Sequence, residues 1–235
     1  MIVMLQILGL QKLTLLDFPG NMACTVFLGG CNFRCPFCHN SPLVVNPDFS
    51  GAMPQEEFFS FLEKRKGILD GVCITGGEPL LSSGIFEFVR AIKQMGYQVK
   101  LDTNGSFPAR LEQLLSACDV DYVAMDIKNA PSLYRQTVGV ESFELAPVME
   151  SVRLLMSGNV PYEFRTTVVR ELHNRQGFEE IATWLTGAKQ YYLQAFVDSG
   201  ALIEDGLHAC SKDEMEAFCD ILRPYIPTVS IRGLE

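Results

Sequence analysis

Residues 72–79 read Val72-Cys-Ile-Thr-Gly-Gly-Glu-Pro79 and indicate the fold class of this chain. The first four residues are apolar or β-branched, which predicts a short buried strand. The Gly76-Gly77-Glu78-Pro79 that follows predicts a turn at the carboxyl end of that strand. A helical pattern over 85–95 comes next and stops at Gly96. A strand, a polar turn and a helix in this order form the repeating unit of α/β folds.

The same unit recurs about six times along the 235 residues. Strands are predicted over 23–28, 72–75, 97–101, 120–125, 162–169 and 190–197, with a short last strand over 228–231. Helices are predicted over 55–66, 85–95, 110–117, 145–156, 178–186 and 212–222. Such alternation predicts a parallel sheet covered by helices, in one domain without a linker. The periodicity fits an open sheet and a barrel-like sheet equally well.

Polar and glycine-rich sequences follow successive predicted strands. They are Gly29-Gly30-Cys31, Gly76-Gly77-Glu78-Pro79, Asp102-Thr103-Asn104-Gly105 and Asp126-Ile127-Lys128. Taken alone, each sequence is equally typical of an ordinary turn. Because the carboxyl ends of parallel strands share one edge, where ligands bind, their common placement predicts a ligand site.

The composition excludes several classes of protein. Hydrophobic residues make up 48% and charged residues 20%, which is typical of a folded domain. The net charge of −9 argues against sequence-independent binding of nucleic acid or of an anionic membrane. No apolar run reaches the length of a membrane span, and residues 1–10 lack the charges and cleavage site of a signal peptide. We therefore expect a cytoplasmic protein.

Three of the eight cysteines, Cys31, Cys35 and Cys38, fall within eight residues. Three thiolates suit a [4Fe–4S] cluster, and a fourth iron without a protein ligand could bind a substrate or cofactor. A structural zinc site with His39 is the alternative, although adjacent Cys38 and His39 are poorly spaced to hold one ion. The scattered cysteines are expected to be small buried hydrophobes. They are Cys24, Cys73, Cys118, Cys210 and Cys219.

The Cys31-x3-Cys35-x2-Cys38 spacing, with Phe37 before the third cysteine, resembles the signature of the radical S-adenosylmethionine enzymes. Together with the Gly76, Asp102 and Met125-Asp-Ile-Lys128 motifs in this order, it resembles the activating enzymes of glycyl-radical enzymes. The stretch Gly9-Leu-Gln-Lys-Leu-Thr-Leu-Leu-Asp-Phe-Pro-Gly20 is most similar to activating proteins of anaerobic ribonucleoside-triphosphate reductase. The resemblance implies a partial (β/α)6 TIM-type barrel with an extension over 1–20, a core over about 21–200 and a helix and short strand over 201–235.

The resemblance also implies roles for individual residues. Cys31, Cys35 and Cys38 are expected to hold one [4Fe–4S] cluster, and S-adenosylmethionine to chelate its fourth iron. The remaining expected contacts to S-adenosylmethionine are Gly76, Gly77, Glu78 and Asp102 at its amino group, Lys128 and Arg165 at its carboxylate and ribose, and Asn104 and Asp126 nearby. A monovalent cation is a further expectation near Asp102, Thr103 and Asp126.

The surroundings of the cationic residues and of the histidines can be predicted without the resemblance. Arg165 lies in an apolar strand and therefore needs an anion, which a ligand carboxylate could supply. Lys128 alone is more typical of a solvated surface charge. His173 and His208 are expected to be ordinary surface or loop residues. The segment Gln194-Ala-Phe-Val-Asp198 carries no histidine, so no such contact to the adenosyl group is expected.

The activity that the resemblance implies is reductive cleavage of S-adenosylmethionine and removal of a hydrogen atom from a glycine of a partner enzyme. The expected partner is anaerobic ribonucleoside-triphosphate reductase, and the expected electron donor is a flavodoxin or ferredoxin. The cofactor supplies the chemistry, so no general acid or base is needed. The alternatives are another glycyl-radical partner of the pyruvate formate-lyase type, a radical enzyme acting on a small molecule, and a non-catalytic zinc module.

Overall fold

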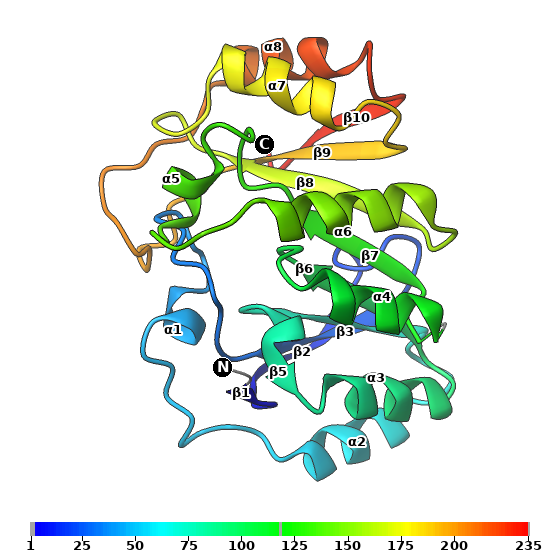
Figure 1. The fold of residues 1–235 in the computed structure, drawn as a ribbon. Coiled ribbons are helices and arrows are strands. Elements are labelled where there is room, and N and C mark those ends of the chain that lie inside the picture. The colour runs from blue at the N-terminus through cyan, green and yellow to red at the C-terminus, as the bar shows by residue number, and fades with distance from the viewer. Residues whose placement is uncertain (1–2, 118, 235) are drawn as a thin grey trace. The chain divides into compact units, whose positions relative to one another are not determined.

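The computed structural model describes residues 3–117 and 119–234, and Figure 1 shows the course of the chain. Within these residues the chain forms two compact units. The first unit comprises the described parts of Met1–Asn32, Pro42–Thr103 and Phe107–Val123, and the second those of Phe33–Ser41, Asn104–Ser106 and Ala124–Glu235. None of the described helices combines the length and the apolar character that crossing a bilayer requires.

The first unit is built on four neighbouring strands in the order β6-β4-β3-β2. They are β2 (Ile7–Thr14), β3 (Ala23–Leu28), β4 (Gly71–Gly76) and β6 (Gln98–Thr103). The pairs β3–β4 and β4–β6 are parallel, as the sequence predicts, whereas β2 runs antiparallel to β3 at the edge. A second, two-stranded sheet pairs β1 (Val3–Met4) with β5 (Ser82–Ser83).

The helices of the first unit bury apolar faces that recur at helical spacing. Figure 1 shows α2 (Gln55–Glu63) and α3 (Ile85–Gln94) next to each other, and the rings of Phe58 and Phe88 meet between them at 5.3 Å. The helix α4 (Pro108–Ser116) begins with proline, whose fixed φ suits a first helical turn. The chain also forms α1 (Ser41–Val44) and a short 3-10 helix over Pro79–Leu81.

The second unit contains the strand order β10-β9-β8-β7. Its strands are β7 (Tyr122–Asp126, of which the last three residues belong to this unit), β8 (Tyr162–Val168), β9 (Gln190–Ala195) and β10 (Thr228–Arg232). The pairs β8–β9 and β9–β10 are parallel. The predicted short last strand is confirmed, and a bidentate ion pair from Arg232 to buried Glu163, at 2.7 and 2.9 Å, ties it to β8.

Four helices belong to the second unit: α5 (Tyr134–Val138), α6 (Ala146–Ser157), α7 (Arg175–Trp184) and α8 (Lys212–Leu222). Figure 1 shows α7 beside α8, where the Phe178 and Phe218 rings stack at 4.3 Å. The helix α7 begins three residues earlier than predicted, because the Asn174 side chain accepts a hydrogen bond from the Gly177 N–H (2.9 Å) and caps it. Ser211 and Glu214 form a reciprocal capping box at the start of α8.

Candidate functional site

Gly76, the last residue of β4, and Gly77, which follows it, lie where a side chain cannot fit. A Cβ on Gly77 would come within 1.9 Å of the Gly30 carbonyl oxygen, and one on Gly76 within 2.4 Å of that of Leu28. Gly76 also has a φ of +113°, which favours glycine. The Glu78 N–H donates to the Gly30 carbonyl oxygen at 2.8 Å. The turn therefore packs directly on the backbone before Cys31, the first cysteine of the motif.

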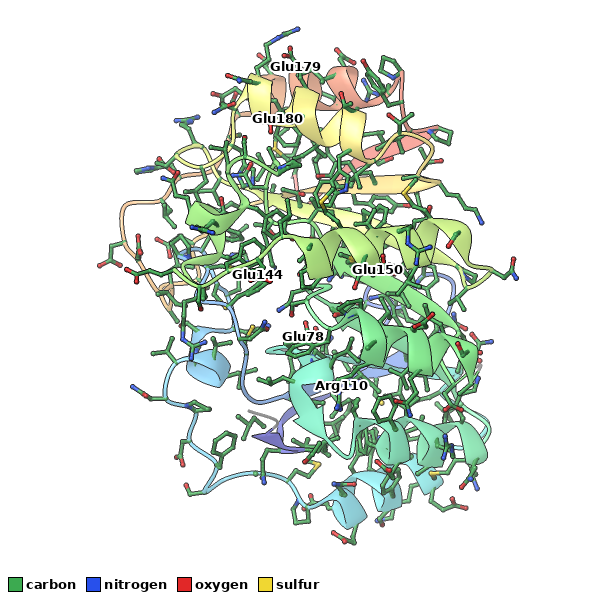
Figure 2. The ribbon with its side chains drawn as sticks, viewed as in Figure 1. Glu78, Arg110, Glu144, Glu150, Glu179 and Glu180 are labelled. Carbon is green, nitrogen blue, oxygen red and sulfur yellow. The ribbon has the colours of Figure 1, made fainter. Side chains whose placement is uncertain are left out.

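Glu78 is fully buried, and its carboxylate is held by two donors. Its Oε1 accepts hydrogen bonds from the Leu80 N–H and from the Thr103 hydroxyl, both at 2.9 Å. The ends of β4 and β6 thus come together, as their parallel pairing requires. Arg110, labelled with Glu78 in Figure 2, donates to the Ser82 carbonyl oxygen at 2.6 Å and fixes the segment after this turn.

Asp102 near the end of β6 forms an ion pair with Lys100, which is only 1% exposed. The two residues are two positions apart on one strand and so point to the same face. Cys73 on β4 is the register partner of Lys100, and its Sγ lies 3.8 Å from both Lys100 Nζ and Asp102 Oδ1. The sequence reasoning missed Lys100, although a lysine with apolar neighbours two residues before an aspartate is the pattern that signals such a pair.

Backbone hydrogen bonds within the second unit fix the loop over Phe33–Ser41, which contains Cys35 and Cys38. The Arg34 N–H donates to the Val138 carbonyl oxygen at 2.8 Å, and the Pro36 carbonyl oxygen accepts from the N–H groups of Ile203 and Glu204 at 3.1 Å. These hydrogen bonds anchor the loop at Arg34 and at Pro36.

His39 belongs to the same loop and is held by a later segment of the second unit. Its Nε2 donates to the Val197 carbonyl oxygen at 2.7 Å, and its ring stacks on Phe196 at 5.7 Å. This nitrogen is therefore engaged with the backbone, whereas the zinc alternative requires a ring nitrogen of His39 as a ligand.

Cys31, Cys35 and Cys38 are all free thiols. Burial raises the pKa of the Cys35 thiol to about 11, while the Lys128 ammonium acts to lower it. Burial also raises the pKa of Cys38, against the same lowering influence of Lys128. A metal must therefore displace protons from these thiols, and the neighbouring ammonium favours the thiolates that result.

The donor set fits an iron–sulfur cluster. Three sulfur ligands suit iron in a cubane, and each thiolate binds a different iron, so the thiols need not meet at one point. Among the described residues, no three His, Cys, Asp or Glu side chains converge closely enough to hold a single ion.

The Asp126 carboxylate, at the end of β7, forms ion pairs with two cationic side chains. Its Oδ1 lies 2.9 Å from both Nε and Nη2 of Arg165, and its Oδ2 lies 2.9 Å from Lys128 Nζ. Burial alone would raise the pKa of Asp126, but Arg165 and Lys128 lower it to about 2. Burial opposes the charge of Lys128, yet Asp126 and Cys35 raise the pKa of that ammonium above its ordinary value. All three groups are charged at neutral pH.

Arg165 meets an anion of the chain itself, Asp126, as its place in an apolar strand requires. Lys128 is only 18% exposed rather than a solvated surface charge.

The turn after β6 contains the predicted site residue Asn104, followed by Gly105. The Asn104 side chain accepts from the N–H and hydroxyl of Ser106, at 2.9 and 2.6 Å, which gives it a turn-forming role. Gly105 has a φ of +76°, and a Cβ there would lie 2.0 Å from the Met125 methyl group.

His173 lies in a loop, one of the two placements expected for it, but the residue is buried rather than exposed. Its side chain is 5% exposed, its Nδ1 accepts from the Val169 N–H at 3.0 Å, and its Nε2 donates to the Lys128 carbonyl oxygen at 3.0 Å. The histidine thus helps to position the backbone of Lys128. His208 is exposed and pairs with Glu171, as expected for a surface residue.

The scattered cysteines fit their predicted role. Cys24, Cys73, Cys210 and Cys219 are buried free thiols, and Cys118 lies outside the described residues. Desolvation raises the pKa of Cys24 to about 12 and that of Cys219 to about 11, so both stay protonated at neutral pH.

Comparison with known proteins agrees with this chemistry. Residues 25–185 match the family model of the radical SAM superfamily. A protein of Methanocaldococcus jannaschii, named "Putative glycyl-radical enzyme activating enzyme MJ1227", is 31% identical over 233 residues, which cover 97% of this chain and 95% of that protein. The pyruvate formate-lyase-activating enzyme of Clostridium pasteurianum is 32% identical over 132 residues, 54% of each chain.

A solved structure shows the same fold. A domain of a pyruvate-formate lyase-activating enzyme from Bacteroides vulgatus superposes with a TM-score of 0.58 at 17% identity, covering 69% of this chain and 99% of that one. The predicted α/β fold of partial-barrel type, with mostly parallel strands, is confirmed.

The chain belongs to the radical SAM superfamily and, within it, to the glycyl-radical enzyme activating enzymes. It is therefore an enzyme whose cofactors are a [4Fe–4S] cluster and S-adenosylmethionine. Its protein substrate is a glycyl-radical enzyme.

Proposed function

We propose that this chain activates anaerobic ribonucleoside-triphosphate reductase by removing a hydrogen atom from one glycine of that enzyme. A [4Fe–4S] cluster held by Cys31, Cys35 and Cys38 would, when reduced, supply the electron for cleavage of S-adenosylmethionine, whose adenosyl fragment would take this hydrogen atom. The cluster chemistry in this proposal is supported by the common neighbourhood of Cys35, Cys38 and Lys128. Thiols beside a buried ammonium suit a cluster that must accept an electron.

Cys31, Cys35 and Cys38 are proposed to hold the cluster. The glycines Gly76 and Gly77 let the ligand approach the backbone, because neither has a side chain and neither position can accept one. Glu78 fixes that turn through Leu80 and Thr103, and its buried charge favours the ligand's ammonium group.

At the other end of the ligand, we assign Lys128 and Arg165 to the carboxylate and ribose, with Asp126 holding both cations in place. An ammonium has three N–H donors, and the Lys128 bond to Asp126 uses one of them. Asn104 shapes the turn after β6 and is proposed as a further hydrogen-bonding residue for the ligand. Asp102 is assigned to the ammonium end of the ligand.

The reductase is proposed as partner because of the likeness of residues 9–20 to activating proteins of that enzyme. In the structure this stretch runs through the edge strand β2 into an exposed segment, in which Leu15 and Leu16 are 68% and 89% exposed. Exposed leucines beside a sheet edge are typical of a surface that meets another protein. The free thiols among the described residues support a reducing cytoplasm as its compartment, with a flavodoxin or ferredoxin as donor.

The test is formation of a glycyl radical in trans. The reconstituted, reduced protein is mixed under anaerobic conditions with S-adenosylmethionine and either anaerobic ribonucleoside-triphosphate reductase or pyruvate formate-lyase. We expect the glycyl-radical doublet in the electron paramagnetic resonance spectrum with the reductase, and none when its radical glycine is replaced by alanine.

A doublet with pyruvate formate-lyase alone would assign the other partner. Cleavage of S-adenosylmethionine without a glycyl radical on either protein would favour a small-molecule substrate. Bound zinc without any cleavage would favour the structural module.

A further inference from the structure

The ion pair between Lys100 and Asp102 bears on how this enzyme balances charge at its ligand site. Asp102 is 14% exposed, and a carboxylate at this depth requires a cation. Such a cation can come from a bound ion or from the chain itself. Here it comes from the chain, because Lys100 Nζ contacts Asp102 Oδ1 directly.

Lys100 has no alternative place for its charge. Its side chain is 1% exposed, and it sits in the middle of β6 opposite Cys73 of β4. Its Nζ lies 3.8 Å from Cys73 Sγ, and a thiol is only a weak acceptor. The buried ammonium and the buried carboxylate therefore depend on each other, and separating them would leave an uncompensated charge inside the first unit.

The other carboxylate considered for a cation site is also paired. Asp126 holds Lys128 and Arg165, each at 2.9 Å. At each carboxylate, a cation of the chain already supplies the positive charge that a metal ion would bring. The residues of each unit therefore do not fit the monovalent cation that the sequence led us to expect.

We propose that this chain binds S-adenosylmethionine without a monovalent metal cation, because Lys100 permanently supplies to Asp102 the positive charge that such an ion would bring. Lys100 is on this account a positioning residue, which acts on the ligand through Asp102. The inference rests on the proposed role of Asp102 at the S-adenosylmethionine site.

The first arm of the test needs no cofactor. Melting temperatures of the cluster-free full chain are compared in KCl and in choline chloride at equal ionic strength. The wild type is expected to melt at the same temperature in both salts. In choline chloride, Lys100→Met should melt roughly 5–15 °C below the wild type, since Asp102 then loses the Lys100 ammonium. KCl should raise the melting temperature of Lys100→Met by roughly 3–6 °C once K⁺ reaches about ten times its dissociation constant.

The second arm measures the affinity of the reconstituted enzyme for S-adenosylmethionine by calorimetry in the same salts. Wild-type affinity should agree within about twofold between them, while Lys100→Met should bind about tenfold more weakly in choline than in KCl. The double variant Lys100→Met/Asp102→Asn should bind weakly and equally in both salts. Lys66→Met changes an exposed lysine of the same unit and should behave as wild type.

A wild-type affinity or melting temperature that rises with K⁺ would overturn the inference, and that result is available even if Lys100→Met does not fold. A second contrary result is a Lys100→Met variant that binds S-adenosylmethionine more weakly than the wild type and shows no dependence on K⁺. That result would leave Lys100 only a packing role and would also overturn the inference. If no variant binds S-adenosylmethionine in either salt, the proposed function fails, whereas the melting arm still settles whether the chain takes up a cation.

Discussion

Arg165 meets Asp126 with two nitrogens on one oxygen: Nε and Nη2 both lie 2.9 Å from Oδ1. The arginine comes from β8 and the aspartate from the end of β7, and Lys128 binds the second carboxylate oxygen. A single carboxylate therefore orients two cations at the sheet edge where a ligand is expected. This arrangement stiffens the site before the ligand arrives, which reduces the ordering cost of binding.

Replacing Asp126 with asparagine should destabilise the protein by about 2–4 kcal/mol, because Arg165 and Lys128 would keep their charges in a largely buried place. Urea denaturation at pH 7 measures the loss. The matched control is Glu150→Gln, which breaks an exposed pair with Arg153 and should leave the free energy of unfolding nearly unchanged. Equal losses in the two variants would show that the buried cations find other partners.

Gly77→Ala should keep its cluster but lose at least about tenfold in affinity for S-adenosylmethionine, since the new Cβ would push Glu78 and its turn away from the Gly30 carbonyl oxygen. Iron content and calorimetry on the same preparation separate the two effects. Gly51→Ala is the control, because nothing lies within 4 Å of its Cβ position. Wild-type affinity in Gly77→Ala would contradict the proposed site.

Stability should fall on acidification below about pH 6.5, the ordinary pKa of histidine. Burial lowers the pKa of His173 in the folded protein. The unfolded chain therefore takes up a proton that the folded chain refuses, and the free energy of unfolding decreases as pH falls, by at most about 1.4 kcal/mol per pH unit.

Urea denaturation at pH 7.5 and 5.5 checks this dependence. His173→Gln should lose part of the pH dependence, whereas His208→Gln, a change at an exposed ring, should keep it. An identical slope in wild type and His173→Gln would show that His173 does not cause it.

Cys35→Ala should reconstitute with little iron and should form no 5′-deoxyadenosine, because a buried cluster ligand is removed. The wild type should hold about four irons, as one cubane requires. Cys210→Ala, at a buried cysteine away from the motif, should match the wild type. About eight irons in the wild type would reveal a second cluster.

The alternation of strands and helices could be predicted from the sequence because each element has its own apolar period and its own stop signal. The start of α7 was placed at 178 rather than Arg175, since the cap at Asn174 lies in a polar stretch without apolar periodicity. The edge strand β2 was missed, since Gln11 and Lys12 interrupt its apolar pattern. Only pairing with β3 makes it a strand.

The candidate site could be predicted as a set of residues but not as a set of contacts. Motif spacing and strand ends singled out Asp126, Lys128 and Arg165, and their mutual pairing depends on the register of neighbouring strands. Lys100 and His173 were missed as partners for the same reason. Lys100 contacts a residue on an adjacent strand, and His173 contacts one that is far away in the sequence. Neither contact can be predicted from the neighbouring sequence alone.

The most direct test of the account is electron paramagnetic resonance of the anaerobically reconstituted, reduced protein with and without S-adenosylmethionine. The account predicts a [4Fe–4S]⁺ signal that changes when S-adenosylmethionine is added, because the ligand binds the iron that lacks a cysteine. A protein that holds zinc and gives no such signal, or a cluster signal that S-adenosylmethionine leaves unchanged, would contradict it.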